Sequence, residues 1–211
     1  AGLITSVALG SASVTATSGT VSATATVTVT QVPASIVLSD TTATAHSLGD
    51  TATATATVKD SGGYVIVNPT ITWASSDTTV VTVSSAGLLT TIADGTATIT
   101  GTSGTVSATA TITVLQVATS VSLSPATLGF VSLADTATLT ATVADSLESV
   151  VVGAAVTWAT SDATVATASD AGLITSVAEG TATITATSGT LSATVSVTVA
   201  QAAASIELSS T

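Results

Sequence analysis

The chain has 211 residues, of which only 6% are charged, and its formal net charge is −11. Lys59 is its single basic side chain. Binding to nucleic acid or to an anionic lipid surface needs clusters of Lys and Arg, so the composition argues against both partners. The mean hydropathy is +0.75, but no apolar run approaches the roughly 18 residues of a membrane-spanning helix, and we expect no membrane insertion in this segment.

The sequence repeats without insertion or deletion, with a period of 85 residues that separates Ala1, Ala86 and Ala171. A fixed period of domain length predicts an array of like modules. We predict four segments: the C-terminal part of a module at 1–31, complete modules at 32–116 and 117–201, and the first strand of a further module at 202–211. We therefore expect this chain to be a window of a longer array.

The first half of a complete module is predicted to form strands at Ser35–Leu38 and Thr51–Val58. The second of these alternates Thr with small apolar residues, and this period of two favours a strand over a helix. In a helix, the same alternation would place apolar residues all round the axis. The positions expected to face inward are Ala52, Ala54, Ala56 and Val58.

The second half of the module supplies its one large ring and a hairpin. Thr70–Trp73 is predicted to place Trp73 in the core, and Trp158 is its copy in the next module. The alternating runs Thr96–Thr100 and Val106–Val114 flank a Ser-Gly pair, which predicts a β-hairpin. About seven short strands per module, separated by turns, indicate an all-β fold of tandem antiparallel β-sandwiches.

A series of short motifs resembles the group 2 bacterial immunoglobulin-like (Ig-like) domain. The motifs are Thr72–Asp77, Val80–Ser84, Gly87–Thr90 and Gly95–Thr100, and residues 157–185 repeat them. The resemblance implies an Ig-like sandwich. It also implies tandem modules of the kind found on bacterial surface proteins, in invasin- and intimin-like adhesins and in some phage structural proteins. It carries over no catalytic residue.

The junctions between modules are short and contain no glycine. Thr113–Val121 runs from the last strand of one module into the first strand of the next, and the earlier junction has the same length with a single proline, Pro33. A short apolar connection restricts the movement of its neighbours more than a Gly/Ser linker does. We therefore expect a fairly stiff array.

The residues needed for catalysis are scarce. His46 is the only histidine, and Val131 takes its place in the next copy, so a His-based nucleophilic mechanism is disfavoured. With no cysteine and one histidine the chain lacks the spacing of a zinc site. No Gly-rich loop opens a helix to bind phosphate. We expect no enzymatic activity, no catalytic residue and no cofactor.

Aspartates recur near the predicted strand ends and raise the question of calcium. The candidate ligands are Asp50, Asp60, Asp77, Asp135, Asp145 and Asp162. Calcium takes six to eight oxygen ligands, which clustered loop carboxylates can supply. A dense Asp/Asn/Gly run is missing, however, so the preferred interpretation is that these side chains hydrogen-bond locally within turns, and no metal is assigned.

The leading functional hypothesis is a structural one: an extracellular or cell-surface array forming a bacterial surface fibre or the stalk of an adhesin. Its partners are then adjacent modules or copies of itself. The alternative is an adhesin module that binds a glycan or receptor through loops that differ between copies, around Tyr64 and Leu147. A phage virion structural protein is a third possibility.

Overall fold

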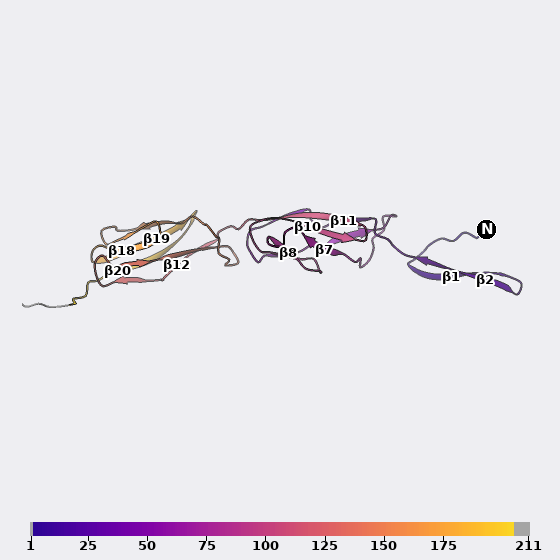
Figure 1. The fold of residues 1–211 in the computed structure, drawn as a ribbon, viewed down its shortest axis with the longest axis horizontal. Coiled ribbons are helices and arrows are strands. Elements are labelled where there is room, and N and C mark those ends of the chain that lie inside the picture. The colour runs from indigo at the N-terminus through magenta and orange to yellow at the C-terminus, as the bar shows by residue number, and fades with distance from the viewer. Residues whose placement is uncertain (1, 205–211) are drawn as a thin grey trace, which may run out of the picture. The chain divides into compact units, whose positions relative to one another are not determined.

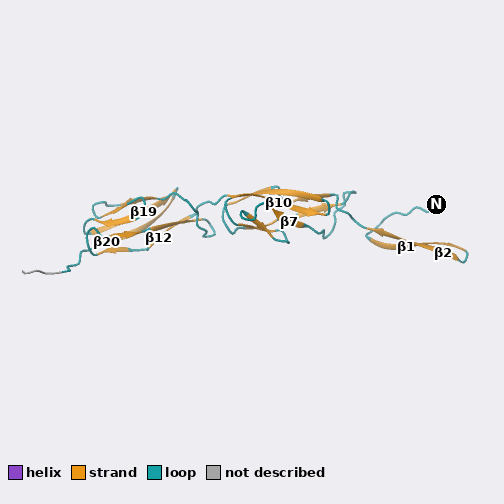
Figure 2. Ribbon diagram, viewed as in Figure 1, coloured by secondary structure: helices purple, strands orange, loops and turns teal. Residues whose placement is uncertain are grey.

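The computed structural model describes residues 2–204, which form strands joined by turns and loops and contain no helix (Figures 1 and 2). No part of this range forms a helix of the length and apolarity needed to cross a membrane. Contacts divide the chain into two compact units. Unit 1 holds the described residues up to 43 and residues 51–113, and unit 2 holds residues 44–50 and those from 114 onward.

The division into units differs from the division into sequence modules at one segment. Residues 44–50 lie inside the module 32–116 but make their contacts in unit 2. The module boundaries remain a prediction. The strand predicted at 202–211 falls mostly outside the described residues, and residues 202–204 are not in a strand.

The first eleven strands begin with a hairpin and continue through the module 32–116. They are β1 (Gly10–Ser18), β2 (Val21–Val29), β3 (Ser35–Leu38), β4 (Thr42–Ala45), β5 (Thr51–Thr53), β6 (Ala56–Lys59), β7 (Thr72–Ser75), β8 (Val81–Val83), β9 (Leu88–Thr91), β10 (Gly95–Ser103) and β11 (Val106–Val114). The hairpin β1-β2 forms a sheet of its own. The others form sheets in the orders β4-β11-β10-β7, β5-β9-β8 and β3-β6.

The module 117–201 repeats this arrangement. Its strands are β12 (Ser120–Ser124), β13 (Leu128–Phe130), β14 (Thr136–Thr138), β15 (Thr140–Ala144), β16 (Thr157–Thr160), β17 (Ala166–Ala168), β18 (Leu173–Ser176), β19 (Gly180–Ser188) and β20 (Leu191–Val199). They pair in the orders β13-β20-β19-β16, β14-β18-β17 and β12-β15. Within this module, every strand pairing is antiparallel except that of β13 with β20, which is parallel.

One predicted strand is in fact two. The run Thr51–Val58 divides into β5, which pairs with β9, and β6, which pairs with β3. The chain changes sheet between them, where the Ala54 amide donates to the Gly87 carbonyl at 2.8 Å. With the additional short strands β4 and β13, the division gives nine strands in each described complete module. It leaves Ala52 exposed, while Val58 is buried as predicted.

The core of unit 2 shows that the two larger sheets pack face to face. Buried side chains from β19 and β20, such as Ile184 and Val197, join those from β17 and β18, such as Ile174, in one cluster. Alternate residues of β20 are buried towards its end, as expected for a strand with one face on the core. Each complete module is thus an Ig-like β-sandwich, and the chain holds such domains in tandem.

The indole rings are half-buried and lie against glycines. Trp158 packs against the core cluster of unit 2. In unit 1, a Cβ on Gly101 would lie 2.8 Å from the Trp73 ring. Gly87 has φ +83°, and a Cβ there would lie 2.6 Å from the Ala54 carbonyl oxygen and 3.2 Å from Trp73 Nε1. The ring therefore fills space that only glycine backbone leaves open.

We expect Trp73→Ala to lower the free energy of unfolding by about 3–5 kcal/mol, because the surrounding side chains are too small to close the cavity. Denaturant titration of the full chain measures this change. If the substitution lowered the free energy of unfolding by less than about 1 kcal/mol, the half-buried ring would contribute little to the core.

A second prediction concerns backbone strain at Ala134, which has φ +63° where its copy Gly49 has φ +79°. A side chain in this left-handed region destabilises the folded state by about 1–2 kcal/mol. Glycine avoids that strain, but it destabilises the protein by about 0.4–1 kcal/mol because it raises the conformational entropy of the unfolded chain. Ala134→Gly is therefore expected to stabilise the chain by about 0.5–1 kcal/mol. The reverse change, Gly49→Ala, is the matched control and should destabilise it in the same titration.

Candidate functional site

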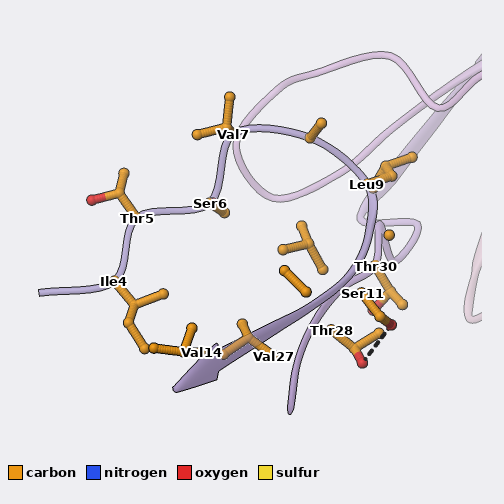
Figure 3. Close-up of a pocket in the computed structure, with 14 residues that line it drawn as sticks. Ile4, Thr5, Ser6, Val7, Leu9, Ser11, Val14, Val27, Thr28 and Thr30 are labelled. Atoms are coloured by element: carbon orange, nitrogen blue, oxygen red, sulfur yellow. Dashed lines mark hydrogen bonds between the residues drawn. The ribbon is translucent and has the colours of Figure 1, made fainter. Parts of the chain in front are cut away.

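An open groove of about 750 Å³ lies beside the hairpin β1-β2 (Figure 3). It is lined by Ile4, Val14 and Val27, among others, and by Ser11 and Thr28, whose hydroxyl oxygens lie 2.9 Å apart. The groove is apolar on one side and carries no carboxylate, imidazole or amine in its lining.

The groove is lined by residues that form the core elsewhere in the chain. Its lining residues Ile4, Ala12, Val14, Val27 and Val29 correspond, one period later, to residues that are at most 8% exposed: Leu89, Ala97, Ile99, Ile112 and Val114. Its apolar character is therefore explained by the alternation of a sandwich strand. We do not assign it a ligand.

Two of the candidate aspartates are held in matching turns. Asp77 Oδ1 accepts hydrogen bonds from the Thr79 amide at 2.9 Å and from the Thr79 hydroxyl at 2.5 Å. Asp162 Oδ1 accepts the same pair from Thr164 at 2.9 and 2.6 Å. The side-chain hydrogen bond is the main cause that lowers the pKa of each carboxyl below its ordinary value.

Asp60 is held in a different turn. Its Oδ1 accepts hydrogen bonds from the amides of Gly62 and Tyr64, each at 3.0 Å. Its Oδ2 accepts a hydrogen bond from Gln31 Nε2 at 2.9 Å. The Gln31 hydrogen bond is the largest cause that lowers the pKa of Asp60, and partial burial opposes it.

Asp145, the copy of Asp60, has the same contacts and one more. Its Oδ1 accepts from the amides of Leu147 and Ser149, at 2.9 and 3.0 Å. Its Oδ2 accepts from Gln116 Nε2 and, in addition, from the Leu48 amide, each at 2.9 Å. Asp145 is only 2% exposed, and among residues 2–204 it is the one charged side chain that is buried.

The four hydrogen bonds keep Asp145 ionised despite its burial. Burial alone raises the pKa of this carboxyl, but donation by Gln116 and by the amides of Leu48, Leu147 and Ser149 outweighs it, so that the pKa is lowered. A buried charge is tolerated when each of its oxygens is satisfied in this way.

The remaining candidates do not assemble into a metal site. Asp50 and Asp135 are exposed. Within residues 2–204, no group of three His, Cys, Asp or Glu side chains is placed so that it could hold a metal ion. The six calcium candidates are thus spread over separate turns, and four of them accept hydrogen bonds from their own turns.

The other residues singled out in the sequence are His46, Tyr64 and Leu147. His46 is exposed and its Nδ1 lies 3.3 Å from the Leu115 carbonyl oxygen. The side chain of Tyr64 is 72% exposed, and that of Leu147 is 52% exposed. Both of these belong to the turns that follow Asp60 and Asp145.

The junction after β11 is hydrogen-bonded to the segment 44–50. The Leu115 amide donates to the Ala45 carbonyl at 3.0 Å, and the Val117 amide donates to the His46 carbonyl at 2.9 Å. One period later, Ala200 and Ala202 make the same bonds to Phe130 and Val131, at 2.9 and 3.0 Å. The residues between modules therefore extend strand-like pairing and do not form free linkers.

The pairing of a junction glutamine with a turn aspartate was missed in the sequence. The available signal was positional: Gln31 and Gln116 keep the same place in the period, and so do Asp60 and Asp145. Each glutamine precedes its aspartate by 29 residues. Only the fold brings residues so far apart in the chain into contact.

The lowered carboxyl pKa values predict a loss of stability in acid. Unfolded aspartates have pKa values of about 4, so the stabilisation by Asp77 is complete above that pH and is lost as the pH falls through the lower folded value. Urea titrations between about pH 5 and pH 2 should show this loss. Asp77→Asn should flatten the profile, and Thr79→Val, which deletes one donor, should flatten it partly. A profile unchanged by Asp77→Asn would contradict the assignment.

The family model of the bacterial Ig-like domain (group 2) matches residues 65–114 and 117–199. No curated protein matches the sequence. Domains 1–6 of the surface layer protein SbsC match with a TM-score of 0.43 and 23% identity, over 92% of this chain and 32% of that one.

Two further solved structures are similar at the same level. Domains 4 and 5 of the S-layer protein SbsC match with a TM-score of 0.38 and 24% identity, over 80% of this chain and 99% of that one. The protocadherin GammaB4 extracellular domain matches with a TM-score of 0.38 and 17% identity, over 87% of this chain and 37% of that one. These likenesses are too weak to carry an argument about function. The family match covers more than half of the sequence, and the chain belongs to the group 2 bacterial Ig-like domain family.

Proposed function

We propose that the chain is a non-catalytic structural array, part of an extracellular bacterial surface fibre or adhesin stalk. The mechanism is mechanical: repeated sandwiches set the length, and hydrogen-bonded junctions limit bending. Membership of the bacterial Ig-like family supports a surface role for tandem modules. The partners are adjacent modules of the same chain and like copies.

The observation that carries this proposal is the parallel pairing of β13 with β20, in the register Leu128↔Val197 to Phe130↔Val199. The chain enters the module through β12, which pairs with β15, then runs into β13 and leaves the module at the end of β20. Tension that reaches β13 draws β13 and β20 in opposite directions and loads their hydrogen bonds together, in shear. An arrangement that shares load among several bonds suits a protein under tension.

The pairing continues beyond β20 into the junction. The amides of Ala200 and Ala202 donate to the carbonyls of Phe130 and Val131. These bonds lengthen the paired region at the point where tension leaves the module. They also tie down residues that a flexible linker would leave free.

A second candidate function is recognition of a glycan or receptor, and the exposure of Tyr64 favours it. The ring is 72% exposed, lies in a turn whose sequence differs between copies, and packs on Gly62 at its edge. Exposed aromatic rings on variable loops are common contacts in binding sites. Loss of glycan-array or receptor binding on Tyr64→Ala would support this function over a purely structural one.

Force spectroscopy on the full chain tests the structural proposal. Each module should unfold in one step, and a period of 85 residues at about 3.6 Å per residue should release roughly 30 nm less the folded length. Ala200→Pro removes the donor to Phe130 and should lower the unfolding force of its module without changing the step length. Leu115→Pro is the matched change at the earlier junction. Gradual extension without steps, or an unfolding force that Ala200→Pro leaves unchanged, would contradict a role in carrying tension.

A further inference from the structure

The contacts of Asp145 join segments that are far apart in the chain. Leu48, whose amide donates to Asp145 Oδ2 at 2.9 Å, lies 97 residues earlier in the sequence. Beside it, the hydroxyl oxygens of Ser47 and Ser146 are 2.7 Å apart, and the Ser149 hydroxyl donates to the Leu48 carbonyl at 3.4 Å. Ser47 is 4% exposed. The pair Ser47-Leu48, here called the Ser-Leu loop, is thus held by backbone and side-chain hydrogen bonds.

The loop comes from the module that precedes Asp145 in the sequence. It belongs to the repeat 32–116, whereas Asp145 belongs to the repeat 117–201. The contacts nevertheless place the whole segment 44–50 in the same compact unit as Asp145. The chain therefore passes between units at three points: before residue 44, after residue 50 and before residue 114.

Asp60 occupies the same position of the period as Asp145. Its turn and its glutamine match those of Asp145, but its Oδ2 accepts a side-chain bond from Gln31 where Asp145 Oδ2 accepts from both Gln116 and Leu48. A cavity of about 440 Å³ opens beside Asp60 and is lined by Gln31, Tyr64 and residues 6–9, among others. Gln31 and Asp60 both line this cavity. Their copies one period later, Gln116 and Asp145, lie next to the Leu48 amide.

We propose that the aspartate at this position of the period is the receptor for the Ser-Leu loop of the preceding module, so that each module docks one loop on the next. Asp145 shows the receptor with its loop docked. The sequence repeats both halves, with Ser132-Leu133 as the next loop and Asp60 and Asp145 as successive receptors. This inference rests on the proposed structural function and names the contact that couples its modules.

The chemistry of the contact explains why it suits a repeated joint. A carboxylate that accepts backbone amides forms charge-assisted bonds, which are stronger than neutral ones. A backbone donor is present whatever the side chain, so the loop can vary in sequence while keeping the bond. The loop is anchored at both ends to the preceding module, so that docking it ties the two modules together beyond the single junction strand.

The decisive experiment compares Asp145→Asn with Asp60→Asn in the full chain, with amide hydrogen exchange as the readout. Asn keeps the shape and one acceptor oxygen, but presents an NH₂ group to the two donors that meet at Oδ2. The Leu48 amide should exchange at least about tenfold faster in Asp145→Asn, since bonds to a charged acceptor are worth that much or more. Asp60→Asn keeps the Leu48 contact intact and should leave its exchange unchanged.

Two internal references keep the test falsifiable if Asp145→Asn weakens the whole unit. The amide of Ile184, in the core of unit 2, reports unfolding of the unit, and the acceleration at Leu48 must exceed any change there. In the unmodified chain, the Leu48 amide should be at least about tenfold more protected than that of Leu133, its 42% exposed copy. Equal protection at Leu48 and Leu133, or equal effects of the two substitutions on Leu48, would overturn the proposal.

Failure of this inference and failure of the structural function are separate outcomes. If the modules unfold in regular steps under force but the Leu48 amide is unprotected, the structural function is supported and the loop-docking proposal is wrong. If the Leu48 amide is protected but no unfolding steps are seen, the loop docks in a protein that does not bear load.

Discussion

The fold depends on burying alternate small side chains between two sheets. Strands such as β19 and β20 contribute Ala, Val and Ile to the core, and each complete module adds a single indole. Small residues fill space only if the backbones approach closely, and this explains why glycine backbone lies against the rings of Trp73 and Trp158. Each half-buried ring thus packs against backbone that has no side chain at the point of contact.

In this chain, hydrogen bonds hold the carboxylates that ion pairs hold in more charged proteins. Among the described residues, no buried side-chain nitrogen or oxygen lacks a partner. Asp77 and Asp162 fix turns through a neighbouring threonine, and Asp145 satisfies four donors while buried. With one basic residue in the whole chain, these carboxylates have almost no cation to pair with, and backbone and amide donors hold them instead.

The hydrogen-bonded junction connects this packing to the proposed function. Packing within one sandwich stabilises a single module, whereas an array also needs contacts between neighbouring modules. The bonds from Leu115 and Val117 to the segment 44–50, and from that segment to Asp145, supply contacts beyond the covalent chain. Together with the parallel pairing of β13 and β20, they are the contacts on which the proposed mechanical role rests.

The period, the all-β class, the family and the hairpin around Ser103-Gly104 could all be predicted from the sequence, because they depend on local alternation and turn chemistry. The sequence could not show that Thr51–Val58 changes sheet between β5 and β6, since both halves keep the same alternation. Nor could it pair Gln116 with Asp145 or bring Leu48 to the same carboxylate, because contacts between residues 29 and 97 positions apart exist only once the strands have packed. Which of several similar aspartates is buried likewise depends on the fold, because burial is set by the segments that pack beside each carboxylate.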